Sequence, residues 1–364
     1  MRILVVIAHY FSAAPTIDMT GMTGLGSTRA PLAKIAAVNS AITALHRYYG
    51  PYRAQRNPDG FMHYDKSEPV LDIVIVTAPG KNLLDRIDID PSLYTVEYPE
   101  VEPLLLGFEA QRIMRERAGR YDMYAFIEDD LIVTDPCYFE KVQWFATSVD
   151  PNAMLMPVRY EMSHSGVPAK VIVEPRMSRE LLSHIVPPNR PSKLQATWHG
   201  QQQTFRHPYN PHSGSYAVTA GQLDVWMRHP SFYDRDTSWM NDPLVCAATY
   251  APGKVFDIYM SAEPNPWFLE IEHYGVRTAA AFAPEGKEFG EPPLLKIAEA
   301  LIARQAESGI GSDAFAPPKE SINSMFSKLA ETTHELESLK RSRSRLAKAL
   351  MRSVFKKATK TSGS

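Results

Sequence analysis

The sequence has few cysteines, no long apolar run and no overall excess of basic charge. Two cysteines among 364 residues exclude a disulfide framework and a cysteine-based zinc site, so a reducing compartment is expected. No apolar run approaches the ~18 residues that a membrane-spanning helix needs. Residues 2–8 are apolar but are followed by no small-residue cleavage site, which predicts a strand rather than a signal peptide. A cytoplasmic protein is therefore expected.

Basic charge is concentrated at one end of the chain. Residues 340–364 contain nine basic and no acidic residues, which leaves 30 basic against 41 acidic residues in the rest. An acidic body argues against nucleic acid as a partner. A heptad pattern predicts a long helix over 320–364, which would either self-associate or bind an anionic membrane surface as a peripheral segment on the inner face. A solvated helix packed on its own domain is the alternative. The heptad residues are Ile322, Leu329, Leu336 and Leu350, with Arg343 interrupting them.

The first half of the chain alternates between strand-like and helix-like segments. Apolar runs at 2–10, 71–76 and 124–127 predict buried strands, and periodic segments from Pro31 to Leu45 and from Pro103 to Arg117 predict helices. This order predicts an α/β fold with a Rossmann-like, mostly parallel central sheet and flanking helices. After residue 150 we expect short strands at 154–158, 170–173, 214–219 and 254–260, a helix from residue 223, and an irregular segment over 185–213.

The strongest local signal is the acidic triplet Glu128-Asp129-Asp130, which directly follows the strand 124–127. Adjacent carboxylates at the end of a buried strand are costly unless a cation or a hydrogen-bond donor shares them. Ligands bind beyond the carboxyl ends of the strands in open α/β sheets. In an extended chain Glu128 and Asp130 would point to one side and Asp129 to the other. A solvated acidic turn that caps a helix near Pro136 is the structural alternative.

This triplet, as an E-D-D variant of a D-x-D-type motif after a strand, resembles the GT-A glycosyltransferases. The resemblance covers about residues 1–290. It implies a nucleotide-sugar donor, most simply a UDP-sugar, whose two phosphates are bridged by a divalent metal. It also implies Asp130 as a metal ligand, Glu128 at the metal or the donor ribose, and Asp129 beside the donor.

Two later segments fit the same resemblance. Asp242, in Trp239-Met240-Asn241-Asp242-Pro243, is similar to the catalytic base of inverting members, since a carboxylate can take the proton of an attacking hydroxyl. A helix cap ahead of Pro243 is the alternative, and both roles are compatible. His273 resembles the C-terminal histidine that often completes the metal site. An imidazole ligand suits Mn²⁺ better than Mg²⁺.

Weaker signals come from the loop after the first strand and from residues 198–212. His9, Tyr10 and Arg29 lie where a nucleotide base and diphosphate would sit, although the glycines between them form no known phosphate-binding loop. A later set of aromatic and polar side chains is of the kind that binds sugars by stacking and hydrogen bonding. That set is Trp198, His199, Gln201, Gln202, Tyr209 and His212.

The resemblance predicts a catalytic domain over 1–290, divided into a nucleotide-binding half (1–135) and an acceptor half (136–290). A packing helix (291–309), a linker (310–319) and the basic helix (320–364) would follow. The expected activity is metal-dependent transfer of a sugar to a hydroxyl of a glycan or lipid-linked acceptor. The alternatives are a metal-independent GT-B glycosyltransferase, a metal-dependent hydrolase or phosphotransferase, and a non-catalytic scaffold with an oligomerising or membrane-binding tail.

Overall fold

The computed structural model describes residues 1–12 and 31–275, apart from residues 57, 59–61, 67–69, 164–168, 187–188, 240–241 and 263–264. The chain divides into two units, Met1–Lys287 and Glu288–Ser364, and the second lies outside the described residues. The loop with Arg29, the predicted helix 292–308 and the basic segment 320–364 also lie outside them. None of the described helices is both long and apolar enough to cross a bilayer.

The central sheet confirms the predicted mixed α/β class. Its order is β13-β6-β1-β4-β5, in which only β13 runs antiparallel to its neighbour. Leu4 and Val6 face one apolar cluster while Ile3, Val5 and Ile7 face another, so β1 is buried on both sides. That double burial explains the continuous apolar run. The strands are β1 (Ile3–Ala8), β4 (Leu71–Val76), β5 (Thr95–Glu97), β6 (Met123–Glu128) and β13 (Ser215–Thr219).

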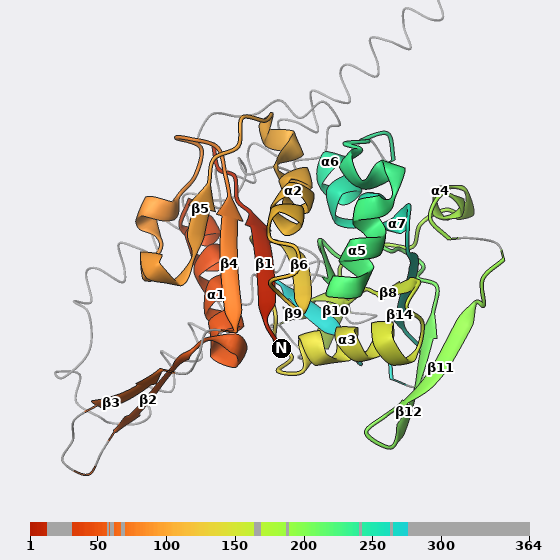
Figure 1. Cartoon of the computed structure of the whole chain (residues 1–364), viewed down its shortest axis with the longest axis horizontal. Coiled ribbons are helices and arrows are strands. Elements are labelled where there is room, and N and C mark those ends of the chain that lie inside the picture. Colours follow the sequence, from red (N-terminus) through yellow and green to blue (C-terminus); the bar gives the residue numbers. More distant parts are fainter. Residues whose placement is uncertain are drawn as a thin grey trace, which may run out of the picture. The chain divides into compact units, whose positions relative to one another are not determined.

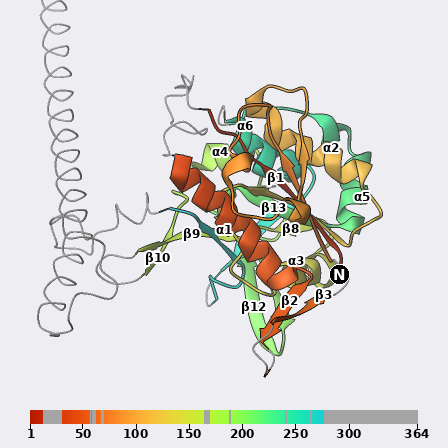
Figure 2. The same ribbon diagram turned by 90° about the vertical axis from the view of Figure 1, so that its left-hand side faces the viewer.

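Helices cover both faces of this sheet (Figures 1 and 2). α1 (Pro31–Tyr49) and α3 (Tyr138–Ser148) contribute to the apolar cluster around Ile3, and α2 (Glu109–Glu116) and α5 (Ala220–Arg228) to the cluster around Leu4. Pro31 is the first described residue of α1, and the segment from Pro31 is helical, as predicted. The predicted helix from Pro103 is divided, because its first six residues form a 3₁₀ helix (Pro103–Phe108).

Three smaller sheets complete the described part. The sheet β10-β9-β15-β7 gathers segments from both halves of the chain, the sheet β11-β12-β14-β8 lies beside it, and β2 pairs with β3. Their strands are β2 (Tyr52–Arg56), β3 (Met62–Lys66), β7 (Leu131–Ile132), β8 (Ala153–Leu155), β9 (Val158–Ser163), β10 (Ala169–Ile172), β11 (Lys193–Trp198), β12 (Gln201–Arg206), β14 (Asp257–Ser261) and β15 (Glu270–His273).

Two expectations for the second half were wrong. The expected single strand at 154–158 is instead two strands, β8, which pairs with β14, and β9, which forms a hairpin with β10. The segment 185–213, expected to be irregular, contains the antiparallel hairpin β11–β12. β11 keeps alternate residues exposed, whereas β12 exposes Gln201 and Gln202 and buries Gln203 and Phe205, so no apolar run marks the hairpin.

The segment after Asp242 is helical, as expected, but irregular. α6 (Pro243–Val245) leads into a π-helical stretch (Cys246–Tyr250) and then into α7 (Ala251–Gly253). Single π-helical turns are rare and often occur at functional sites. α4 (Arg179–Ser183) is a short helix between β10 and β11.

Candidate functional site

The acidic triplet lies at the carboxyl edge of the central sheet. Ala8 at the end of β1 pairs with Glu128 at the end of β6, so His9 and Asp129 leave the sheet side by side. The chain passes from β1 to β4 on one side and to β6 on the other, which makes this edge the point where the strand order reverses. Such points form the ligand-binding crevices of open α/β sheets.

The second sheet brings distant residues to the same edge. β7 starts immediately after Asp130 and pairs with β15, which sets His273 opposite Leu131. β15 also pairs with β9, which carries Arg159 and Glu161. Tyr274 donates its backbone N–H to the carbonyl of Asp130 at 2.7 Å. Strand register, rather than proximity in sequence, therefore assembles the side chains around the triplet.

Each acid of the triplet has a different basic partner. Asp129 turns toward β1 and α1: its Oδ2 lies 2.6 Å from His9 Nδ1 and its Oδ1 accepts from Lys34 Nζ at 2.5 Å. Only 4% of Asp129 is exposed. Asp129 is therefore held inside the protein by two bases from other segments.

His9 is fully buried and uses both ring nitrogens. The backbone N–H of Leu83 donates to Nε2 at 3.1 Å, so Nε2 is the acceptor and Nδ1 carries the proton donated to Asp129. Tyr10, the next residue, is half-buried and packs against the apolar cluster around Leu4. The geometry gives both residues a supporting role in the fold, and the nucleotide contacts predicted for them stay predictions.

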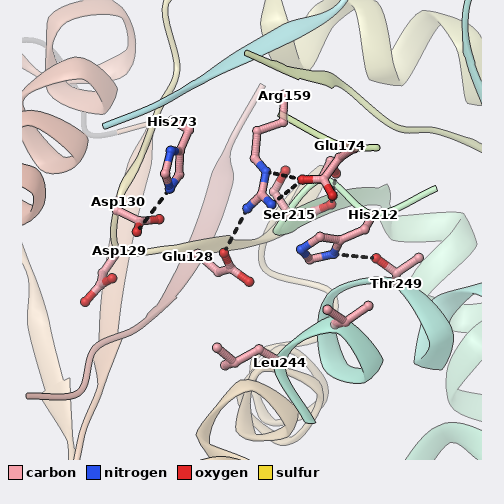
Figure 3. A network of polar contacts seen from close by, with 12 residues as sticks. Glu128, Asp129, Asp130, Arg159, Glu174, His212, Ser215, Leu244, Thr249 and His273 are labelled. Atoms are coloured by element: carbon pink, nitrogen blue, oxygen red, sulfur yellow. Dashed lines mark hydrogen bonds and ion pairs between the residues drawn. The ribbon is translucent and has the colours of Figure 1, made fainter. Parts of the chain in front are cut away.

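Asp130 faces His273. Asp130 Oδ2 lies 3.6 Å from His273 Nε2 (Figure 3). On the other side of the ring, His273 Nδ1 lies 2.8 Å from Oε1 of the fully buried Glu161. Burial lowers the pKa of His273, but the hydrogen bond and charge of Asp130, with the hydrogen bond to Glu161, raise it more, so the pKa lies above its usual value. A carboxylate that fixes one imidazole nitrogen and leaves the other facing a second carboxylate is typical of metal-binding histidines.

Glu128 points toward Arg159. The two side chains approach to 3.4 Å, and Arg159 also donates Nε–H to Glu174 at 2.7 Å (Figure 3). Burial raises the pKa of Glu128 to about 7, although the charge of Arg159 opposes the rise. Gly214 lies against this carboxylate at φ +67°, and a Cβ at this position would lie 2.6 Å from Glu128 Oε2. A glycine is therefore required both by the backbone conformation and by the space that Glu128 takes.

His212 completes the group. Its Nδ1 lies 3.3 Å from the hydroxyl of Thr249, which belongs to the π-helical turn (Figure 3). Burial and the nearby charge of Arg159 keep the pKa of His212 well below its usual value, so the ring is neutral at pH 7. A neutral imidazole can donate from one nitrogen and accept at the other, which suits hydrogen bonding to a hydroxyl.

The arrangement of the triplet differs from the expectation for an extended chain. The chain turns at residues 129–130, and the ion pairs of the three acids are made with different partners, namely Arg159 for Glu128, His9 and Lys34 for Asp129, and His273 for Asp130. Within the described ranges, no group of three or more His, Cys, Asp or Glu side chains is arranged to hold a metal ion. Asp130 and His273 are the pair of predicted metal ligands that the fold brings together.

The remaining predicted residues divide into two cases. Asp242 caps the helix that starts at Pro243: its Oδ1 accepts from the backbone N–H groups of Leu244 at 3.0 Å and Val245 at 3.2 Å, which confirms the capping alternative. The cap uses one carboxylate oxygen only. Arg29 lies outside the described residues.

Sequence reasoning missed several residues of the site. Lys34, Arg159, Glu161 and Glu174 were not singled out, although Glu161 is fully buried and Arg159 nearly so. The available signal was the alternation of charged and apolar residues in Val158–Ser163, which places charges on one side of a strand. This alternation does not indicate which residues the charged side chains contact.

A surface pocket of about 460 Å³ lies at the end of β5. It is bordered by an ion-pair network in which Arg112 binds Glu97 and Glu109 at 2.7 Å each and Glu116 at 2.9 Å, and Arg235 binds Glu109. The guanidinium groups at this pocket are thus already neutralised by carboxylates. The pocket contains none of the triplet residues.

No family model matches the sequence, and no curated protein matches it. Several solved structures are weakly similar, among them the three that follow. A 4-diphosphocytidyl-2C-methyl-D-erythritol synthase is 11% identical with a TM-score of 0.29, over 71% of this chain and 86% of that one. A CMP:2-keto-3-deoxy-manno-octonic acid synthetase complexed with CTP is 12% identical with a TM-score of 0.29, over 84% and 100%.

The third is a protein from Thermus thermophilus described as mannose-1-phosphate geranyltransferase. It is 11% identical with a TM-score of 0.27, and the match covers 71% of this chain and 69% of that one. Scores at this level carry no argument about ligands or activity. The assignment of the fold rests on the strand order and helix positions described above.

Proposed function

We propose that this protein is a GT-A-type glycosyltransferase that transfers a sugar from a nucleoside-diphosphate donor, with UDP-sugars as the first donors to test, to a hydroxyl of a glycan or lipid-linked acceptor. The observation that carries the proposal is the meeting of Asp130 and His273 at the carboxyl edge of the parallel sheet, 3.6 Å apart. These residues are 143 positions apart in the sequence and are brought together by the pairing of β7 with β15.

The donor set fits a divalent ion that shares its ligands with a diphosphate. Asp130 offers carboxylate oxygen, and His273 offers Nε2 when its Nδ1 proton is donated to Glu161. Metal ions at nucleotide sites are commonly held by one or two protein side chains together with substrate phosphates and water. An imidazole ligand favours Mn²⁺ over Mg²⁺. When bound, the ion supplies positive charge that stabilises the leaving diphosphate.

The protein's own side chains would perform the other tasks. Arg159, held between Glu128 and Glu174, brings positive charge to the edge where the diphosphate would lie. Neutral His212 would orient a sugar hydroxyl, since one of its nitrogens is fixed by Thr249. We assign Asp242 as the base that accepts the proton of the acceptor hydroxyl, with inversion at the sugar carbon, because its cap leaves one oxygen uncommitted to the helix.

The test is a binding screen with nucleoside diphosphates and nucleotide-sugars, with and without Mn²⁺, read by the thermal stability of the protein. The proposal predicts that UDP or another nucleoside diphosphate raises the unfolding temperature only with the metal, and that Asp130→Asn removes the effect. Asp242→Asn should keep donor binding and lose transfer by at least about 100-fold. If a nucleotide raises the unfolding temperature by the same amount without Mn²⁺ as with it, and by the same amount in Asp130→Asn as in wild type, the proposal is contradicted.

The basic segment 340–364 is proposed to hold the protein on an anionic membrane surface, near a membrane-delivered acceptor. Each Lys or Arg close to such a surface contributes about 1 kcal/mol. Deleting residues 320–364 should release the protein from vesicles that contain phosphatidylserine and leave donor binding unchanged. Unchanged sedimentation with these vesicles would refute this role.

A further inference from the structure

A second group of side chains, which we call the basic clamp, consists of two arginines, Arg176 and Arg206, and the ring of Tyr209. The guanidinium carbons of Arg176 and Arg206 lie 4.3 and 4.0 Å from the centroid of the Tyr209 ring. Tyr209 is 49% exposed, and Arg176 is also exposed. Among the residues that the structure describes, neither arginine forms an ion pair with a carboxylate.

The clamp differs from the other arginines of the described part in holding two cations on one ring, since several of the others pair with carboxylates and Arg2 and Arg115 each lie alone over a tyrosine ring. Arg112 and Arg117 pair with Glu97, Arg159 pairs with Glu174, and Arg190 pairs with Asp257. In the clamp, two like charges are held against one ring, which stabilises each cation but leaves their mutual repulsion uncompensated. Arg206 donates one N–H to the backbone carbonyl of His207 at 3.1 Å, which does not neutralise its charge. An anion beside the two groups would reduce the repulsion.

The clamp is connected to the candidate site through two short segments. Met177 donates its backbone N–H to the carbonyl of Tyr209 at 3.0 Å, and the side chain of Asn210 donates to the carbonyl of Pro175 at 2.9 Å. The same two segments carry Glu174 and His212, which lie near each other in the site (Figure 3). Arg176 therefore follows Glu174 of the site by two residues, and Tyr209 precedes His212 of the site by three.

A third cation lies close to the clamp. Lys193 of β11 is directly opposite Arg206 of β12 in the antiparallel pair, so their side chains emerge on the same side of the hairpin. Lys193 is exposed. Like charges at directly opposite positions are unfavourable in a sheet, so this pairing adds to the positive charge that an anion would neutralise.

We propose that the basic clamp binds a phosphate group of the acceptor, so that the acceptor of this enzyme is phosphorylated. The planar forks of two arginines match the oxygens of a phosphate, and the half-exposed position leaves room for the rest of the molecule outside. The anion site stands on its own geometry, and only its assignment to the acceptor rests on the proposed glycosyl transfer. The bound phosphate takes no part in the chemistry and positions the acceptor hydroxyl.

The test measures the affinity of the full chain for inorganic pyrophosphate by calorimetry, with metal chelated so that the proposed donor site is inactive. The double variant Arg176→Ala/Arg206→Ala should bind pyrophosphate at least about tenfold more weakly than wild type. Arg176→Lys and Arg206→Lys should lose less affinity, because charge is kept and only the fork is lost. If the double variant does not fold, these lysine variants still decide the question, with an expected loss of about threefold each.

Arg47→Ala is the matched control. Arg47 is an exposed arginine of α1 outside the clamp, and its removal changes the net charge by the same amount as the loss of one clamp arginine. It should leave the affinity for pyrophosphate unchanged. Equal affinities of wild type, the Arg47→Ala control and the clamp variants would overturn the proposal, since the remaining cations, including the basic segment 340–364, would then account for all binding.

Two further arms identify the source of the phosphate. Glucose 1-phosphate tests a soluble phosphate ester, and phosphatidylcholine vesicles with phosphatidic acid test a phosphate carried by a lipid. Clamp-dependent binding in one arm assigns that source, and an absence of clamp dependence in both overturns the acceptor assignment. Binding of UDP with Mn²⁺ should be unchanged in the clamp variants. The clamp variants could lose pyrophosphate binding while Asp130→Asn leaves the affinity for UDP with Mn²⁺ unchanged. That result would support the anion site at the clamp and refute the proposed donor site.

Discussion

Two groups of carboxylates lie at the carboxyl edge of the central sheet, and they are built differently. Around Arg112 the ion pairs are mainly local, since Glu109 and Glu116 are three and four residues away on the same helix, and Arg112 is 34% exposed. At the end of β6, Asp129 is buried and its partners His9 and Lys34 are 120 and 95 residues away. The Arg112–Glu116 pair is exposed, and such pairs contribute little to stability, whereas buried charges such as Glu109 and Asp129 are costly unless fully paired.

The comparison indicates that the two groups have different purposes. The Arg112 network joins helix α2 to the end of β5 through Glu97. The group at β6 brings several titratable residues together at this edge, where the pKa values of Glu128, His212 and His273 are shifted. Perturbed pKa values of this kind are concentrated at functional sites. The following predictions test whether the two groups differ as described.

The largest effect is expected for Asp129→Ala. The substitution leaves the ammonium of Lys34 largely buried without its carboxylate, and the free energy of unfolding should fall by about 3–5 kcal/mol. Urea denaturation measures the change, with Asp130→Asn as the control that keeps most of the stability. A loss below about 1 kcal/mol for Asp129→Ala would mean that this residue is not a structural anchor.

Glu128→Gln should change the pH dependence of stability. The pKa of Glu128 is about 7 in the folded protein, above the unfolded value, so the folded state binds the proton more tightly. The contribution of Glu128 to the free energy of unfolding therefore decreases in the wild type as pH rises from about 4.5 to 7. Glu128→Gln has no titrating carboxyl at this position, so it lacks this decrease. Relative to wild type, the variant should gain about 1–3 kcal/mol between pH 5 and pH 8. A constant difference across this range would contradict the raised pKa.

Gly214→Ala should destabilise more than Gly80→Ala. Both glycines have positive φ, at +67° and +64°, but a Cβ at Gly80 meets nothing within 4 Å whereas one at Gly214 collides with Glu128. Measured by chemical denaturation, the free energy of unfolding should fall by about 1 kcal/mol for Gly80→Ala and by about 2 kcal/mol for Gly214→Ala. Equal losses would show that the carboxylate of Glu128 moves away freely. Weaker donor binding is expected only in Gly214→Ala.

The smallest effect is expected for Arg112→Ala in the local network. Glu109 keeps Arg235 as a partner and the other two glutamates reach solvent, so the free energy of unfolding should fall by about 1 kcal/mol or less. The loss should shrink further at high salt, because exposed pairs are screened. Nucleotide binding should not change. A loss comparable to that of Asp129→Ala would remove the distinction between the two groups.

The buried strands of the fold could be predicted from the sequence, and so could the position of the acidic triplet at the end of one of them. The apolar runs located β1, β4 and β6, and the position of Glu128 after a buried strand placed the acids at the carboxyl edge of the sheet. The sequence did not allow prediction of the partners of the acids. Those partners are fixed by the register of β7, β9 and β15, which pairs segments more than 100 residues apart. The polar hairpin β11–β12 was missed because its exposed glutamines conceal the strand period.

The central claim is that Asp130 and His273 hold a divalent ion that in turn holds a nucleoside diphosphate. The most direct measurement is a crystal structure with UDP and Mn²⁺, with anomalous scattering used to locate manganese. The account predicts one manganese bound by Asp130, by His273 Nε2 and by oxygens of both phosphates. A diphosphate bound at this edge with no ion at Asp130, or manganese bound only at other residues, would contradict it.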